Sequence, residues 1–325
     1  MAWLIQFLIA LQYWVFNMDF MKKIVVYSEK SPSASFVMKG VNHDVAETVC
    51  LAMKKDFFSK LFFKIFFYLH LYKIAVLFRF EKNIRMKIKS GKIQKVIFFD
   101  CVLLKEYFVL DTLMKKKQGK YIYFWNPIKY RQSNENKAKF LLKKLENMRF
   151  VLKTFDLEDS KRYQIAFLKS PNRRISFNQK RKIVDFYFAG LPKGRECFLE
   201  TMKEELLKKN FSSKFILVRG KKDYISQEEN RINSENCRCI VDLVSDAYGQ
   251  ANLSLRSTDA LFLEKKVITN CEAVVDADFY NPANIFLIRN MSLDGIENFM
   301  NRPYEKISEN IVNSYEINNW LKNNF

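Results

Sequence analysis

The hydrophobic pattern divides the chain into two blocks, and in each block buried strands alternate with amphipathic helices. In the first block, continuous apolar runs and helical spacing predict strands at 24–27, 94–100, 121–125 and 150–155, with helices from Asn42 to Met53, over 103–114 and over 137–148. The second block predicts strands at 183–189, 215–219, 239–243, 266–269 and 285–288, with helices over 196–209, around 260–262 and over 305–323. Such alternation is typical of parallel sheets covered by helices on both faces.

Residues 170–182 separate the two blocks, because this stretch is polar, basic and without periodicity. We therefore expect one α/β domain over 21–172, a second over 180–304 and a terminal helix over 305–325. Two parallel sheets that face each other across a linker enclose a cleft. Open parallel sheets bind ligands beyond the carboxyl ends of their strands, so the cleft is the expected place for a site.

Residues 1–17 form a short apolar segment without a charged side chain. A membrane anchor, an interfacial helix and translation of sequence upstream of the true start all remain open. The segment has neither the basic start nor the cleavage site of a secretory signal, and its length is at the lower limit for crossing a bilayer. We favour an upstream extension over residues 1–20, because Met21 opens MKKIVVYSEK, a common beginning for a cytosolic α/β protein.

Residues 54–80 interrupt the alternation with phenylalanines and lysines at helical spacing. Lys60 and Lys64 lie one turn apart, and too many lysines interrupt the run for a comfortable membrane span. Two interpretations stay open. One is a helix in the headgroup plane of a membrane with its lysines reaching lipid phosphates, and the other is a core helix with a solvated basic face.

Composition and charge narrow the function classes. Hydrophobic residues make up 49% of the chain, which excludes disorder as the default. The net charge is +20, and residues 51–150 alone carry 24 basic and 7 acidic side chains. Such a field attracts phospholipid, phosphorylated glycolipid or nucleic acid. Six cysteines and two histidines lack the paired spacing of a zinc site, so we expect no metal centre.

A glycine-containing turn is the first candidate for ligand chemistry. The sequence Gly190-Leu-Pro-Lys193-Gly194-Arg195 follows a predicted buried strand and precedes a predicted helix. Glycines allow close approach of the backbone, a helix start offers unpaired N–H groups, and the two cations add charge, which together suit a phosphate or diphosphate. An ordinary basic turn is the alternative.

A second candidate lies between Asp242 and Leu261. Gln250, Ser254, Arg256 and Asp259 occupy a loop and the first turns of a helix. Arg256 and Asp259 are three residues apart and so share a face, where the carboxylate suits a ribose diol and the guanidinium a diphosphate. Taken alone, the pair is equally consistent with a surface ion pair.

The order of these features resembles the bacterial GT-B glycosyltransferases that build surface polysaccharide and lipopolysaccharide. That group has a strand, G-x-x-K-G-R, a helix, then D-x(n)-Q-x-G-L-T-x-R-x-x-E-A-L and a strand that ends in K-x-I-T-N. The positions that match here include Gly190, Lys193, Gly194, Arg195, Asp242, Gln250, Ser254, Arg256 and 266–270 (KVITN). The likeness covers roughly residues 95–290, while Asn252 replaces a Gly and Asp259 replaces the ribose-binding Glu. The opening YSEKSPSASF is most similar to core rhamnosyltransferases.

The resemblance implies two Rossmann-like domains that face a cleft, with a nucleotide sugar in the second. The donor diphosphate would contact Lys193, Arg195 and Arg256, whose charge replaces a metal, and Asp259 and Gln250 would orient the nucleoside and sugar. No cofactor is expected. The acceptor hydroxyl needs a base from the first domain. Asp44 and His43 follow its first strand and loop. Adjacent helical side chains point about 100° apart, so only one of them can face the cleft, and we favour Asp44 over His43.

The implied acceptor is a phosphorylated glycolipid, the lipid A–core, at the cytoplasmic face of the inner membrane. This explains why the basic surplus lies in the acceptor half. A nucleic-acid-binding protein would also be basic and aromatic, but the aromatic residues here lie in buried runs and lysine dominates. A non-catalytic scaffold at the membrane surface is the third possibility, and binding of a nucleotide sugar separates the transferase from both.

Overall fold

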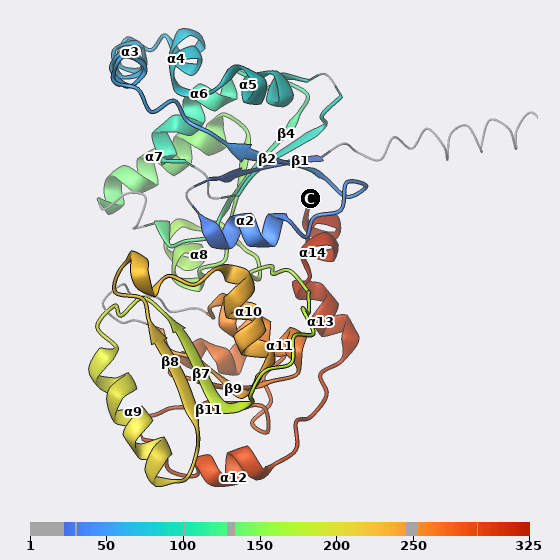
Figure 1. The fold of residues 1–325 in the computed structure, drawn as a ribbon. Helices are drawn as coiled ribbons and strands as arrows, with labels where there is room; N and C mark the ends of the chain where they lie inside the picture. Colours follow the sequence, from blue (N-terminus) through green and yellow to red (C-terminus); the bar gives the residue numbers. More distant parts are fainter. Residues whose placement is uncertain are drawn as a thin grey trace, which may run out of the picture. The chain divides into compact units, whose positions relative to one another are not determined.

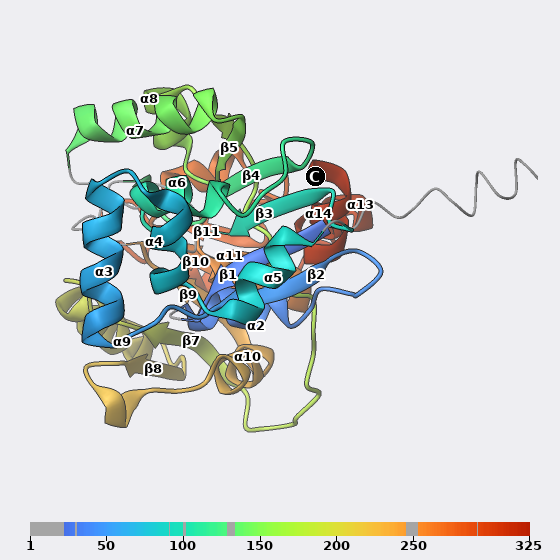
Figure 2. The same ribbon diagram turned by 90° about the horizontal axis from the view of Figure 1, so that it is seen from above.

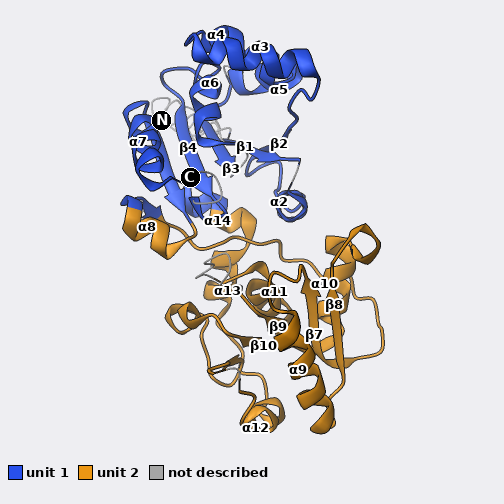
Figure 3. Cartoon of the chain, turned by 90° about the vertical axis from the view of Figure 1, so that its left-hand side faces the viewer, with its two compact units in different colours: residues 1–154, 163–166, 321–325 blue, residues 155–162, 167–320 orange. Residues whose placement is uncertain are grey.

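The computed structural model describes residues 23–29, 31–90, 92–99, 102–128, 134–244, 253–290 and 292–325. Within them the chain forms two compact units (Figure 3). Unit 1 consists of residues 1–154, 163–166 and 321–325, and unit 2 of residues 155–162 and 167–320. The predicted extension 1–20 and Gln250 lie outside the described residues.

Unit 1 is built on a sheet with the strand order β2-β1-β3-β4-β5-β6, in which all pairings among β1 to β5 are parallel. Its strands are β1 (Lys23–Ser28), β2 (Glu47–Leu51), β3 (Lys95–Phe99), β4 (Gly119–Phe124), β5 (Phe150–Thr154) and β6 (Ala166–Phe167). Its helices are α2 (Pro32–Met38), α3 (Phe57–Tyr68), α4 (Tyr72–Arg79), α5 (Lys82–Lys89), α6 (Tyr107–Asp111) and α7 (Glu135–Asn147). Helix α2 lies on one side of β1 and β2, and α5 and α6 lie on the other (Figures 1 and 2).

Unit 2 is built on a parallel sheet with the order β11-β10-β9-β7-β8. Its strands are β7 (Val184–Gly190), β8 (Ser213–Leu217), β9 (Cys237–Asp242), β10 (Lys266–Thr269) and β11 (Ile285–Leu287). The helices that accompany them are α8 (Leu157–Tyr163), α9 (Glu196–Lys208), α10 (Gln227–Glu235), α11 (Leu255–Leu263), α12 (Ile296–Asn301) and α13 (Glu309–Tyr315). The last helix, α14 (Ile317–Asn324), begins in unit 2 and ends in unit 1.

The side chains of β7 show how helices cover both faces of this second sheet. Phe186 and Phe188 pack with residues of α9 and α12, whereas Tyr187 and Ala189 pack with residues of α11 and α13. Because successive side chains of a strand point to opposite faces, one buried run serves two cores. This is the reason that four successive residues, 186–189 (FYFA), are apolar or aromatic.

The predicted strands are present in both units, but the segment between β1 and β2 differs from the prediction. No helix begins at Asn42; residues 42–46 form turns, and Glu47–Leu51 is the edge strand β2, which pairs with β1. The loop predicted over 28–35 is shorter, because α2 begins at Pro32. The Ser31 hydroxyl accepts a hydrogen bond from the Ala34 N–H at 3.2 Å, and proline is favoured in the first turn of a helix.

The polar stretch 170–182 also differs from the linker that we expected, because it belongs to unit 2. Arg174 forms a bidentate ion pair with Glu309, and the Phe177 N–H donates to Glu235 at 2.7 Å. Side chains of unit 2 therefore satisfy the polar groups of this extended backbone, and the boundary between units falls after Thr154 instead. The terminal helix expected over 305–323 is two helices, α13 and α14.

The phenylalanine-rich segment 54–80 forms the helices α3 and α4. Phe63 is the one buried residue of α3, while its other phenylalanines and leucines are exposed or half-buried. One side of α3 therefore packs on the core of unit 1, as a core helix would, but most of its apolar side chains lie outside that core. None of the described helices combines the length and the apolar character needed to cross a bilayer.

Candidate functional site

The candidate site lies at the carboxyl end of the unit 2 sheet, between β7 and β9. The chain leaves β7 towards β8 on one side and leaves β9 towards β10 on the other. In an open parallel sheet this reversal of strand order leaves a crevice outside the carboxyl ends of the two central strands. The two turns that the sequence singled out, after β7 and before α11, both reach this position.

The turn after β7 is held by Arg195. Its guanidinium donates to the Leu191 carbonyl at 2.6 Å, to the Pro192 carbonyl at 3.2 Å and to the Leu243 carbonyl beyond β9. Lys193 and Gly194 both adopt the left-handed conformation, with φ of 52° and 80°, so the turn carries its one strained non-glycine residue next to a glycine. Arg195 thus ties the ends of the two central strands together.

Arg256 reaches the same place from the first turn of α11, whose N-cap is Ser254. Its Nη2 and Nε donate to the Ala189 carbonyl at 2.7 and 3.2 Å. A Cβ on Gly190 would lie 2.4 Å from Nη2, so glycine at that position leaves the room that this guanidinium occupies.

Phe188 brings the two arginines together. The guanidinium carbons of Arg195 and Arg256 lie 5.2 and 4.9 Å from the centre of its ring. Both distances are within the range of cation–π contacts, which favour a cation on an aromatic face. Arg195 and Arg256 therefore meet at one place, and Phe188, which no sequence motif indicated, contacts both of them.

Asp242 supplies negative charge beneath the two arginines. This fully buried residue at the end of β9 accepts hydrogen bonds from the hydroxyls of Ser254 and Ser257, each at 2.6 Å. Arg256 Nη1 lies 3.5 Å from Asp242 Oδ1 and 3.5 Å from Ser254 Oγ, both longer than a good hydrogen bond. Nη1 is therefore the part of Arg256 best placed to contact a ligand.

The three cations at this edge destabilise one another. Burial, together with the positive charge of Arg256, lowers the pKa of Arg195 to about 10, while Asp242 acts in the opposite direction. Burial and the charges of Arg195 and Arg256 also hold the pKa of Lys193 below its usual value. Asp242 and Glu196 offset only part of this effect, because the pKa of Arg195 stays lowered, so a bound anion would relieve the remaining repulsion.

Asp259 lies in a different environment from Arg256, although the two are three residues apart. One carboxylate oxygen, Oδ1, accepts from Arg231 Nη1 at 2.5 Å and from Asn172 Nδ2 at 2.8 Å. Burial raises the pKa of Asp259, against the effect of the Arg231 charge. These contacts brace α11 against α10 and the 170–182 segment, and the ribose contact predicted for Asp259 stays a prediction.

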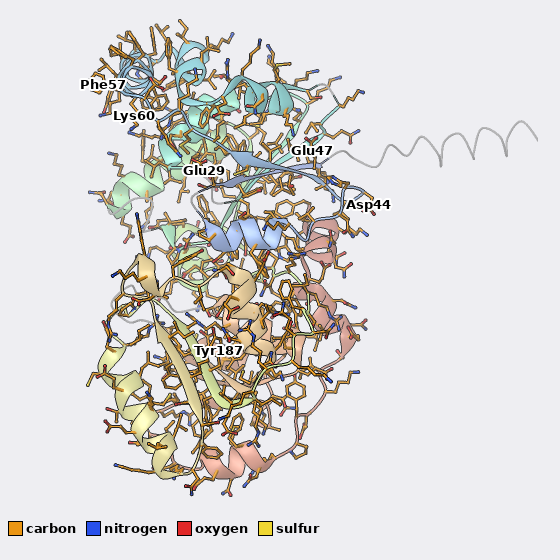
Figure 4. The ribbon with its side chains drawn as sticks, viewed as in Figure 1. Glu29, Asp44, Glu47, Phe57, Lys60 and Tyr187 are labelled. Atoms are coloured by element: carbon orange, nitrogen blue, oxygen red, sulfur yellow. The ribbon has the colours of Figure 1, made fainter. Side chains whose placement is uncertain are left out.

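Asp44 and His43 do not lie at the carboxyl end of the unit 1 sheet, where a catalytic base was expected. Both lie in the turn before β2, and they are exposed. Because β2 runs parallel to β1, this turn is at the amino end of the sheet, opposite the ligand-binding end. Figure 4 shows Asp44 and Glu29 at opposite ends of the β1 and β2 pair. Glu29 follows β1 directly, and its carboxylate pairs with Lys55 at 2.9 Å.

Unit 2 also contains a mostly apolar cavity of about 230 Å³, and none of Lys193, Arg195 and Arg256 lines it. The start of α11 and the segment after β10 contribute to its walls. Its lining comprises Phe155, Leu157, Phe167, Lys169, Ser170, Leu253, Thr258, Ala273, Asp276, Ala277, Asp278 and Tyr315. Among the described residues, no three His, Cys, Asp or Glu side chains gather in a way that could hold a metal ion.

Comparisons with known proteins rest on structure, because no family model and no curated protein matches the sequence. AviGT4, a glycosyltransferase involved in avilamycin A biosynthesis, aligns with a TM-score of 0.51 at 8% identity, over 93% of this chain and 95% of that one. The chain has the GT-B glycosyltransferase fold. The UDP-GlcNAc 2-epimerase of Methanocaldococcus jannaschii aligns at a TM-score of 0.49 with 12% identity, over 88% of this chain and 95% of that one.

Proposed function

We propose that this GT-B chain is a glycosyltransferase that uses a nucleotide sugar as donor. The observation that supports this most directly is the convergence of Lys193, Arg195 and Arg256 at the strand-order reversal of unit 2. Three mutually repelling cations with one buried carboxylate suit a ligand with two or more negative charges, such as a diphosphate. Binding of the diphosphate would stabilise the charge that develops on the leaving nucleoside diphosphate.

Within this cluster the residues have different tasks. Arg195 spends its hydrogen bonds on three carbonyls, so it acts as a positioning residue that also contributes charge. Arg256 Nη1 and Lys193 are the groups we propose for direct contact with the diphosphate. Gln250, Ser254 and Asp259 are proposed to orient the donor, Ser254 through its role as the N-cap of α11. We propose that this charge makes a metal unnecessary.

The base that accepts the proton of the acceptor hydroxyl is proposed to be Glu29. A base that serves the acceptor is expected at the carboxyl end of β1. The residue there is Glu29, not Asp44 or His43. Lys55 pairs with this carboxylate and orients it.

For the substrates, we propose a deoxyhexose, with rhamnose as the first candidate, and the lipopolysaccharide core as acceptor. The similarity of the opening YSEKSPSASF to core rhamnosyltransferases supports the sugar. The surplus of basic residues over 51–150 supports a phosphorylated glycolipid acceptor. The protein would then work peripherally at the cytoplasmic face of the inner membrane.

Titration calorimetry with uridine, guanosine and thymidine diphosphate sugars tests the donor site. At least one donor should bind the natural protein, and Arg256→Ala should weaken that binding about thirtyfold, which corresponds to about 2 kcal/mol for a hydrogen bond to a charged group. Arg174→Ala is the matched control, because Arg174 is an arginine of the same unit that pairs with Glu309 on an exposed surface. Equal affinity in both variants would refute the assignment.

Comparing the glycolipid masses of cells with and without the gene tests the substrates. Loss of a deoxyhexose, a hexose or no sugar gives three different masses, and no change at all would favour the non-catalytic scaffold. Binding of DNA or RNA in preference to every nucleotide sugar would instead favour the nucleic-acid-binding alternative.

A further inference from the structure

The helices α3 and α4 present a large apolar surface to solvent. Phe57 and Phe58 are 72% and 68% exposed, and Tyr68 is 74% exposed. We call this surface the hairpin face; it consists of Phe57, Phe58, Leu61, Phe62, Ile65, Tyr68, Leu69, Leu71, Ile74 and Leu77, each at least 39% exposed. Contiguous apolar patches of this kind on a soluble protein mark a surface that another partner covers.

The helical positions explain why these side chains share one face. At 3.6 residues per turn, Phe58, Phe62, Ile65 and Leu69 follow one line along α3, and Phe57, Leu61 and Tyr68 follow the adjacent line. The buried Phe63 and the half-buried Phe67 lie on the opposite side. Lys60 and Lys64 border the apolar lines at one edge, and Figure 4 shows Phe57 and Lys60 on the outside of unit 1.

The chain reverses after α3 so that α4 extends the same surface. His70 adopts a left-handed φ of 57°, and the Leu71 N–H donates to the Phe66 carbonyl at 2.8 Å, a tight helix ending. Phe62 and Phe66 then pack on Phe78 of α4, with ring centres 5.2 and 5.4 Å apart. Internal aromatic packing thus fixes the two helices against each other while their outer side chains stay exposed.

Charge indicates which partner covers the hairpin face. Residues 57–89 carry eight lysines and arginines but a single acidic side chain, Glu81. Two copies of this face would bring like charges together, which disfavours a symmetric dimer. An anionic bilayer, by contrast, accepts aromatic rings at its headgroup level and attracts lysines whose stems reach past them.

We infer that the hairpin face docks on an anionic lipid bilayer. Phe57, Phe58 and Tyr68 enter the interface, and Lys60 and Lys64 contact lipid phosphates. The inference deepens the proposed function, since it assigns a particular surface to the contact with the membrane that holds the acceptor. The binding itself needs neither donor nor acceptor, so it is measured separately from sugar transfer.

Vesicle flotation tests the inference with the full-length protein. The vesicles contain either phosphatidylcholine alone or phosphatidylcholine with phosphatidylglycerol, without any glycolipid. The protein should bind the anionic vesicles more strongly. Replacing two lysines near a membrane surface loses about 1 kcal/mol for each, so Lys60→Gln with Lys64→Gln should weaken binding about thirtyfold. Phe57→Ser with Phe58→Ser should weaken binding to a similar or greater extent.

Matched controls exist on α9 of unit 2. Leu207 is 71% exposed, so Leu207→Ser removes a similarly exposed apolar side chain, and Lys203→Gln with Lys208→Gln removes the same two charges. These controls should bind vesicles like the natural protein. Residues 1–22 are present in every protein compared, so their contribution cancels in the ratios.

Three results would overturn the inference. Equal binding to neutral and anionic vesicles removes its electrostatic basis, and equal losses in the α3 variants and the α9 controls remove its location. If sedimentation shows that Phe57→Ser with Phe58→Ser converts a dimer to a monomer without a change in vesicle binding, the occupant is a second copy instead. Loss of donor binding with intact vesicle binding would refute the proposed function and leave this inference standing.

Discussion

The two sheets have the same order in their first five strands, yet the turns at their carboxyl ends carry opposite chemistry. Both units place their second strand outside the first and their third strand on its other side. After β7 the turn carries Lys193 and Arg195, whereas after β1 the corresponding turn carries a carboxylate, Glu29, next to Lys30 in the sequence. The shared topology determines where a site can form, and the side chains on the turn determine whether it attracts an anion or a proton.

The two turns also differ in the contacts that hold their side chains. In unit 2, carbonyl groups of Ala189, Leu191 and Leu243 hold two arginines against Phe188. In unit 1, α2 begins a few residues after Glu29, and Lys55 pairs with its carboxylate. The first arrangement is rigid and preorganised for a fixed charge, and the second leaves a carboxylate at a surface where a substrate hydroxyl can approach.

The largest effect expected from this comparison is on turnover. Glu29→Gln should lower the rate of sugar transfer about 100-fold or more, because a positioned general base contributes factors of that size. Calorimetry should show unchanged donor affinity, since the variant leaves unit 2 intact. Asp44→Asn is the control and should retain full turnover. The reverse outcome would restore Asp44 as the base.

Gly190→Ala should have the next largest effect, on donor affinity. The new methyl group would lie 2.4 Å from Arg256 Nη2 and would displace that guanidinium from the Ala189 carbonyl. We expect donor affinity to fall about tenfold or more, the order of a hydrogen bond to a charged group. Gly220→Ala meets no atom within 4 Å and is the control. Unchanged affinity in Gly190→Ala would mean that the position of Arg256 does not matter.

Asp259→Asn separates bracing of the fold from ligand contact. Removing one partner of a buried ion pair costs about 3–5 kcal/mol, so the free energy of unfolding should fall measurably in urea. If Asp259 acts only through Arg231 and Asn172, the donor affinity of the folded variant should stay within a small factor of the natural value. A loss of donor affinity with unchanged stability would support the ribose contact instead.

The smallest effect concerns pH. Because the pKa of Arg195 is lowered to about 10, its positive charge is present at neutral pH and is lost as the pH rises through that value. A bound diphosphate favours the charged form, so a nucleoside diphosphate should raise the melting temperature more at pH 8 than above pH 10. Without ligand, the folded protein should become more stable as the pH rises through the lowered pKa of Arg195, because loss of this proton relieves the repulsion between the cations. Arg256→Ala should flatten the ligand effect.

The sequence was sufficient to predict an element where the local hydrophobic pattern alone fixes its secondary structure. Strand β10 occupies the residues predicted for it, and the glycine turn after β7 lies where its composition indicates. It was insufficient for β2, because residues 47–51 were predicted as part of a helix from Asn42 to Met53 and form a strand instead. The pairing of this strand with β1 decided between them, and that pairing joins residues more than twenty positions apart.

The sequence by itself determined two α/β units, the cationic turn of unit 2 and the apolar, basic segment of unit 1, because burial of strands and helix faces is written in local periodicity. Only the tertiary structure decided that Arg195 and Arg256 meet on Phe188, that Asp259 turns to Arg231, and that Glu29 rather than Asp44 stands at the carboxyl end of its sheet. Those outcomes depend on strand order and on contacts between distant segments, which no local pattern encodes.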